Sequence, residues 1–143
     1  QNDIDPKPGR PLREKLTTPD TFINSSDIIQ YTLIQSDNNC SDLLLKSIGG
    51  VEAVQTYLKE LGLPNIQINN SEWEMFQSWN LIYSNQARPR DITTLLTKLY
   101  SETLFSDSCH SFLCSNGRNP FRHICCVVLV ECYSRKSRGC PLP

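Results

Sequence analysis

At 143 residues the chain is long enough for one domain, because a domain of about this size buries roughly 68–70% of the surface that its unfolded chain exposes. Fourteen basic residues against fifteen acidic ones leave a net charge of −1, which argues against nucleic acid or an anionic membrane as a partner. No apolar run approaches the roughly 20 residues of a transmembrane helix, and the polar, proline-bearing N-terminus lacks the pattern of a signal peptide.

The first segment, residues 1–24, is predicted to be an extended lead-in. It holds four prolines and shows no apolar periodicity, a combination typical of looped chain. A short helix should then begin with Ser25 or Ser26 as its N-cap, since Asp27 stands in the first turn. The polar cluster at residues 36–39 ends this helix.

Four further helices are predicted downstream. Residues 41–48 are apolar on nearly every side and stop at a Gly-Gly pair, so this helix should be buried. Residues 51–61 place apolar side chains at i, i+3, i+7 and i+10, on one helical face. Pro89 opens the third helix, and a shorter one is expected to end near residue 113. The inward positions of the third helix are Ile92, Leu95, Leu96 and Leu99.

Residues 63–88 contain aromatic and amide side chains but no sustained helical or strand period. So long a loop in a compact domain is usually functional or disordered. Trp73 and Trp79 are expected to be core residues, because large rings are the usual means by which a long loop packs itself down. With helices on both sides and no strand predicted, residues 25–114 form an all-α unit.

The last segment, residues 115–143, differs in composition. Six of the seven cysteines lie in the last thirty-five residues, an arrangement open to disulfides, a zinc site or a tail of different origin. The candidate zinc ligands match no common spacing, so no metal is expected. These candidates are His123, Cys125, Cys126 and Cys132.

The polar cluster Ser36-Asp37-Asn38 lies between two predicted helices, at the mouth of the expected core. Alone, such a cluster indicates a helix-capping turn, because these residue types cap helices in many proteins. Its surroundings, from Tyr31 through Gly50, resemble the Ser-Asp-Asn segment of class A serine β-lactamases, and the resemblance covers residues 28–113. It implies a mainly α chain: the all-α lobe of the α/β serine β-lactamase/transpeptidase-like fold, with most of the antiparallel sheet missing.

The resemblance also implies roles for individual residues. Ser36 resembles the serine that relays a proton to the lactam nitrogen, and Asn38 the amide that binds the substrate's acylamino side chain. Asp37 is expected to be structural, accepting backbone N–H groups in the turn. Glu72 falls where the family's omega loop presents the general base for deacylation, and Glu74 is the alternative if the register shifts by two.

Phe76 stands four residues after Glu72, where the family usually has a polar residue that helps to hold the attacking water. A phenyl ring has no group for that task. The resemblance therefore implies either a differently arranged pocket or an impaired deacylation, in which the acyl-enzyme is trapped.

Two other motifs of the family are absent from the 143 residues. None of the six lysines has a serine three residues before it, so the nucleophile's Ser-x-x-Lys is missing, as is the strand-borne Lys-Thr-Gly. With suitable third bases, residues 116–124 and 134–141 read one nucleotide later give peptides that resemble the family's continuation. This observation leads to the hypothesis that residues 115–143 are translated out of frame.

The expected function is hydrolysis of β-lactams through a serine acyl-enzyme, without metal or cofactor, by a monomer in the periplasm or outside the cell. This chain alone is expected to be inactive because it lacks the nucleophile. Two rivals are considered: a penicillin-recognising transpeptidase, which an omega-loop glutamate fits poorly, and a non-enzymatic helical module for protein contacts.

Overall fold

A computed structural model of the chain describes residues 11–12 and 22–101, with side chains as far as Lys98. After a helical turn at residues 11–12, the helices in this part of the chain follow one another with short connections, except for the loop that contains α5 and α6. They are α2 (Ser25–Gln35), α3 (Asn38–Ile48), α4 (Val51–Glu60), α5 (Glu72–Gln77), α6 (Trp79–Ile82) and α7 (Pro89–Ser101). These residues form no extended sheet, and the predicted mainly α fold is confirmed for them.

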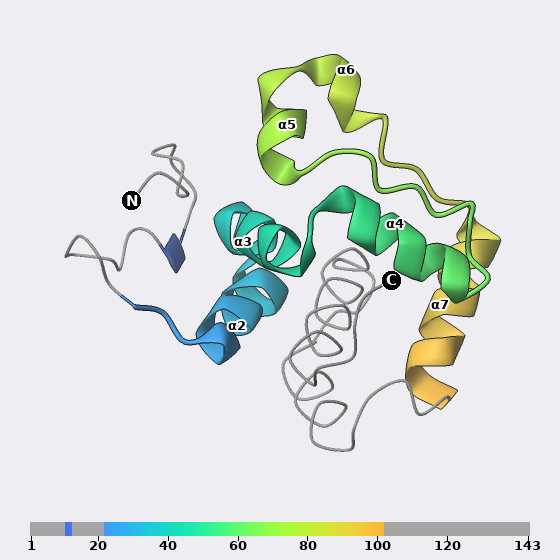
Figure 1. Ribbon diagram of the computed structural model, residues 1–143, viewed down its shortest axis with the longest axis horizontal. Helices are drawn as coiled ribbons and strands as arrows, with labels where there is room; N and C mark the ends of the chain where they lie inside the picture. Colours follow the sequence, from blue (N-terminus) through green and yellow to red (C-terminus); the bar gives the residue numbers. More distant parts are fainter. Residues whose placement is uncertain (1–10, 13–21, 102–143) are drawn as a thin grey trace.

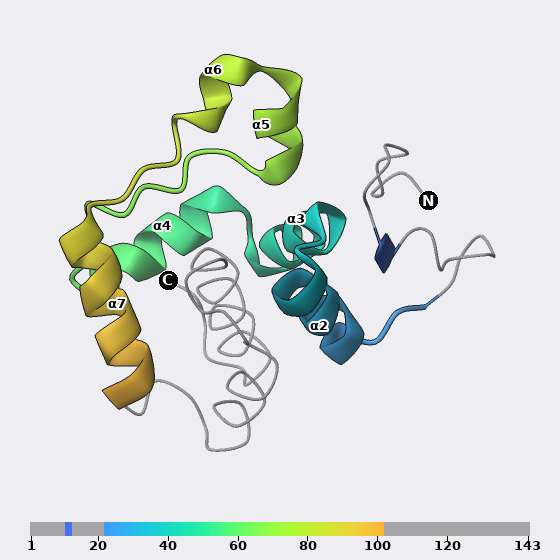
Figure 2. The same ribbon diagram turned by 180° about the vertical axis from the view of Figure 1, so that it is seen from behind.

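Helices α2 and α3 pack against each other, and α4 continues from α3 after a Gly-Gly turn (Figure 1). Helices α5 and α6 form the tip of a long loop that projects beyond α3 and α4. The loop has a first limb, before α5, and a second limb, after α6. The two limbs run side by side toward the start of α7, as Figures 1 and 2 show from opposite sides. A single antiparallel bridge between Gln67 and Gln86 joins the limbs.

The core is built from one face each of α2, α3, α4 and α7, together with the first limb of the loop. The predicted burial of Val54, Leu58 and Leu95 is confirmed, and Ile92 and Leu96 are half-buried against the core. The side chain of Leu99, also predicted to point inward, lies outside the described residues. The buried apolar members of the core are Ile29, Leu33, Leu44, Leu45, Ile48, Val54, Tyr57, Leu58, Leu63, Ile66 and Leu95.

The starts of two helices differ from the sequence-based expectation. The prediction that Ser25 or Ser26 caps α2 was wrong, because the side chain of Asn24 accepts the Ser26 N–H at 3.1 Å. Helix α3 begins at Asn38 rather than near residue 41, because Asp37 provides its cap before the apolar run begins. Helix α3 ends before the Gly-Gly pair, as predicted. Gly49, the first of the pair, adopts φ 114°, a conformation that is strained for residues with a Cβ.

The loop contains two short helices, α5 and α6, that the apolar pattern does not predict. Helix α5 begins in a capping box: Ser71 Oγ accepts the Glu74 N–H at 3.2 Å, and Glu74 Oε2 accepts the Ser71 N–H at 2.8 Å. Neither helix has a buried residue, so neither leaves an apolar period in the sequence. The Ser-x-x-Glu spacing is the signal that would have predicted α5.

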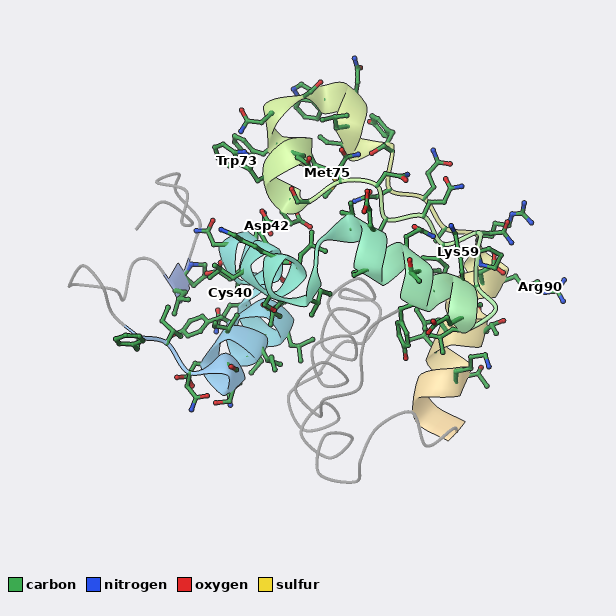
Figure 3. The ribbon with its side chains drawn as sticks, in the orientation of Figure 1. Cys40, Asp42, Lys59, Trp73, Met75 and Arg90 are labelled. Atoms are coloured by element: carbon green, nitrogen blue, oxygen red, sulfur yellow. The ribbon has the colours of Figure 1, made fainter. Side chains whose placement is uncertain are left out.

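The prediction that Trp73 and Trp79 belong to the core was wrong. Trp73 is 45% exposed and Trp79 is 80% exposed. Asp42 accepts a backbone N–H of the tip, Asn85 contacts the sulfur of Met75, and Met75 and Leu81 are half-buried there. Figure 3 shows the Trp73 ring at the outer edge of α5.

Several sequence-based predictions lie outside the described residues: most of the lead-in, the helix ending near residue 113, and the cysteine-rich tail. Within residues 11–12 and 22–101, no helix has the length and apolar character needed to cross a membrane.

Candidate active site

Ser36 lies in the turn between α2 and α3, and its side chain is exposed. Among the described residues other than glycine, it alone has a positive φ, with φ 54° and ψ 40°. This left-handed conformation costs an L-residue roughly 1–2 kcal/mol. Ser36 is the C-cap of α2, a position at which helices commonly end in this conformation, and its N–H donates to the Tyr31 carbonyl.

Asp37 fixes the backbone on both sides of this turn. Its side chain is fully buried, at 0% exposure. Oδ1 accepts the Cys40 N–H at 3.1 Å and caps α3, while Oδ2 accepts the Leu12 N–H at 2.8 Å. The carboxylate therefore ties residues 11–12 to the turn and sets the positions of the residues on either side, Ser36 and the half-buried Asn38.

Cys40 lies beneath the turn and is fully buried. Burial raises the pKa of its thiol well above the ordinary value, and the negative charge of Asp37 and a hydrogen bond with that carboxylate raise this pKa further. The thiol is therefore protonated at neutral pH. It acts as a small apolar group beneath the turn rather than as a nucleophile.

Asp42 joins α3 to the loop that carries Glu72. Its Oδ1 accepts the Glu72 N–H at 2.9 Å, and its Oδ2 accepts the Trp73 N–H at 2.8 Å. Figure 3 shows Asp42 between α3 and the start of α5. Because Asn38 and Asp42 are four residues apart on one helix, they share a face. The face of α3 that bears Asn38 is thus the face on which α5 docks.

The two candidate carboxylates of the loop have different surroundings. Glu74 is exposed, and its Oε2 accepts hydrogen bonds from both the N–H and the Oγ of Ser71 in the capping box. Glu72 is half-buried at the first position of α5, next to the contact with Asp42. Phe76 is four residues further along α5 and 55% exposed.

Asn85, on the second limb, closes the loop below the tip. Its Oδ1 accepts the N–H groups of Asn69 and Asn70 at 2.7 and 3.0 Å, and its Nδ2 donates to the Asn70 carbonyl at 2.9 Å. Nδ2 also contacts the sulfur of Met75, at 3.3 Å. Neither Asn85 nor Asp42 was identified from the sequence, because their partners are 10 to 31 residues distant along the chain.

No three His, Cys, Asp or Glu side chains gather closely enough to hold a metal ion within the described ranges. The groups assembled around α3 are a hydroxyl, an amide and carboxylates. Such groups can relay protons and bind a polar substrate.

The model of the beta-lactamase enzyme family matches residues 3–123, and the chain therefore belongs to this family. It is 34% identical to the VEB-1 β-lactamase of Pseudomonas aeruginosa over 113 residues, which are 78% of this chain and 38% of that protein. It is 31% identical to a β-lactamase of Bacteroides uniformis over 97 residues, or 68% of this chain and 33% of that protein.

Among solved structures, the TLA-1 extended-spectrum β-lactamase matches with a TM-score of 0.76 and 32% identity, covering 80% of this chain and 41% of that one. The chain thus spans well under half the length of these relatives. The resemblance to class A β-lactamases stated from the sequence is confirmed over this part.

Proposed function

We propose that this chain carries part of the active site of a class A serine β-lactamase. The reaction is acylation of a serine by the β-lactam, followed by hydrolysis of the ester by an activated water. The observation that supports this proposal most is the docking of α5 on α3 through Asp42. This contact brings the helix that begins with Asn38 together with the helix that begins with Glu72.

In this proposal, the hydroxyl of Ser36 relays a proton to the lactam nitrogen as the ring opens. A hydroxyl both donates and accepts, so it can pass a proton on. Its exposure supports the role, because an exposed hydroxyl can reach a bound substrate; its left-handed backbone is that of the residue that caps the C-terminus of α2. Asn38 binds the amide of the substrate's side chain, and Asp37 holds both residues in place.

Glu72 is the general base that activates the deacylating water. Its half-buried position favours it over Glu74, whose carboxylate is exposed and engaged with Ser71. Phe76, on the same helix, has no group to hold the water, so the proposal includes slow hydrolysis of the acyl-enzyme. Replacing Phe76 with asparagine should then accelerate deacylation.

The 143 residues alone should not turn over a β-lactam, because they contain neither Ser-x-x-Lys nor Lys-Thr-Gly. The complete enzyme is proposed to act as a monomer on β-lactams in the periplasm or outside the cell. Residues 115–143 are proposed to be an out-of-frame tail. Codons that are incompatible with the two shifted peptides would disprove the frameshift.

A chimera tests the site directly. Residues 28–101 of this chain would replace the matching segment of the VEB-1 β-lactamase, and nitrocefin hydrolysis would be measured. The chimera should be active, and Ser36→Ala or Asn38→Ala should lower kcat/KM by about 100-fold, within the range of a lost acid–base or binding group. Asn65→Ala, in the turn after α4, is the matched control.

Purified wild-type chain should show no nitrocefin hydrolysis in the same assay. Turnover by the chain alone that Glu72→Ala abolishes would contradict the proposed inactivity. Equal activities of the Ser36→Ala, Asn38→Ala and Asn65→Ala chimeras would contradict the assigned roles.

A further inference from the structure

The first limb of the loop lies against α4, and one side chain of α4 makes two polar contacts with its backbone. Gln55, on α4, donates from Nε2 to the Ile66 carbonyl at 2.9 Å. Its Oε1 accepts the Ile68 N–H at 3.0 Å. One amide side chain thus satisfies two backbone groups that flank a single residue, Gln67.

These two contacts reproduce the edge of a β-ladder. In an extended chain, the carbonyl before a residue and the N–H after it point to one side, while that residue's own N–H and carbonyl point to the other. On the other side of this limb, Gln67 exchanges both hydrogen bonds with Gln86, at 2.7 and 2.9 Å. The limb therefore passes, at the bridge residue Gln67, between the backbone of Gln86 and the side chain of Gln55.

Gln55 is well placed to fix this limb to the core. Three residues of the same helix, Val54, Tyr57 and Leu58, are at most 1% exposed. Ile66, whose carbonyl Gln55 binds, is itself 2% exposed. A side chain rooted on a packed helix holds its partner more precisely than one on a mobile segment would.

We propose that Gln55 is a positioning residue for the loop that carries Glu72. It fixes the register of the first limb against α4, and the Gln67–Gln86 bridge passes that register to the second limb. The tip then meets α3 where Asp42 receives the Glu72 N–H. The catalytic meaning of this role rests on the proposed function, whereas the positioning itself can be measured on the chain without substrate.

The contacts of Gln55 also determine how the base of the loop, the segment around Gln67 and Gln86, responds to ionic strength. An amide side chain and backbone groups carry no net charge, so salt does not screen their attraction as it screens an ion pair. The register of the base should therefore be the same at low and high ionic strength. The contact of the Asp42 carboxylate with the Glu72 N–H, at the tip of the loop, differs in that it involves a charged group.

The test is amide hydrogen exchange on the purified chain. Gln55→Glu keeps the shape of the side chain but removes its donor and sets a carboxylate against the Ile66 carbonyl. Exchange at Ile68, Gln67 and Gln86 should become about 10-fold faster or more, as expected for a lost hydrogen bond with an unpaired partner. Exchange at Leu44, within α3, should not change.

The tryptophan signals give a second, spectroscopic readout. Both tryptophans of the chain, Trp73 and Trp79, lie on the loop tip, so their indole N–H resonances report on the loop alone. Gln55→Glu should shift or broaden these resonances. A change that affected only the stability of α4 would leave them unaltered in the folded protein.

Two variants keep the result decisive. Gln30→Glu, at an exposed position of α2, makes the same charge change away from the loop and should leave both readouts at their wild-type values. Gln55→Met retains the apolar stem, so it tests the lost hydrogen bonds should Gln55→Glu not fold. It should accelerate exchange at Ile68 and leave Leu44 unchanged.

Two outcomes would overturn the proposal. One is exchange at Ile68 and Gln67 that is equal in Gln55→Met, Gln30→Glu and the wild type. The other is an acceleration of the same size at Leu44 as at Ile68, which would show a global effect on stability. No β-lactam enters the experiment, so its outcome is independent of whether the proposed function holds.

Discussion

The turn at residues 36–38 and the loop at residues 63–88 carry the two parts of the candidate site, and they are held in different ways. The turn depends on one fully buried carboxylate, Asp37, between two packed helices. The loop depends on side chains that bind its backbone, among them Asp42, Gln55 and Asn85, while its large rings remain exposed. Residues of the turn should therefore move only when the core unfolds, whereas the loop can open locally.

Asp37→Ala should have the largest effect, because it removes the cap of α3 and leaves two backbone N–H groups without their acceptor. We expect a loss of about 3 kcal/mol in the free energy of unfolding, measured by urea denaturation. Asp27→Ala, at an exposed position in the first turn of α2, is the control and should cost about 0.5 kcal/mol. Equal losses in the two variants would show that the turn has no special support.

Asp42→Ala should cost less, about 1 kcal/mol, because only the tip of the loop loses its acceptor. Amide exchange at Glu72 and Trp73 should accelerate while exchange within α3 and α4 stays at its wild-type rate. Asp42→Asn keeps one acceptor oxygen, so its exchange rates at Glu72 and Trp73 should lie between those of the wild type and those of Asp42→Ala. If exchange at Glu72 and Trp73 is unaffected by Asp42→Ala, the loop is not held as the structure indicates.

Ser36→Gly should stabilise the protein by about 0.5–1 kcal/mol, because glycine adopts φ 54° without strain. Ser47→Gly, on an exposed helical position of α3, should instead destabilise it by a few tenths of a kcal/mol. Urea denaturation of both variants gives the sign of the change in the free energy of unfolding. In the chimera, Ser36→Gly should also lose activity with the hydroxyl, a trade of stability against function.

The smallest effect concerns Cys40, whose pKa is raised in the folded state. Because the folded pKa lies above the unfolded value of about 8.5, the stabilising contribution is full below that pH and declines as the pH rises through it. Under reducing conditions, the free energy of unfolding should be measured at pH 7 and at pH 8.5. Between these two pH values, the wild type should lose about 0.4 kcal/mol more of this free energy than Cys40→Ala does. If the free energy of unfolding depends on pH in the same way in the wild type and in Cys40→Ala, the thiol ionises equally in the folded and the unfolded state.

Helices α4 and α7 could be predicted from the sequence because each buries a regular apolar face. Helices α5 and α6 bury no residue, so only the capping box of Ser71 and Glu74 could have indicated α5. The residue types at 36–38 were enough to find the turn. The contact of Asp42 with the loop could not be found in this way, since it joins residues 30 positions apart that share no local pattern.

The central claim is that Glu72 faces the same site as Ser36 and Asn38. Mass spectrometry of the chimera after mixing with benzylpenicillin tests it most directly, by following the covalent acyl-enzyme with time. We expect Glu72→Gln to accumulate an acyl-enzyme that persists, while Glu74→Gln clears it at the unsubstituted rate. Persistence in Glu74→Gln together with normal clearance in Glu72→Gln would contradict the account.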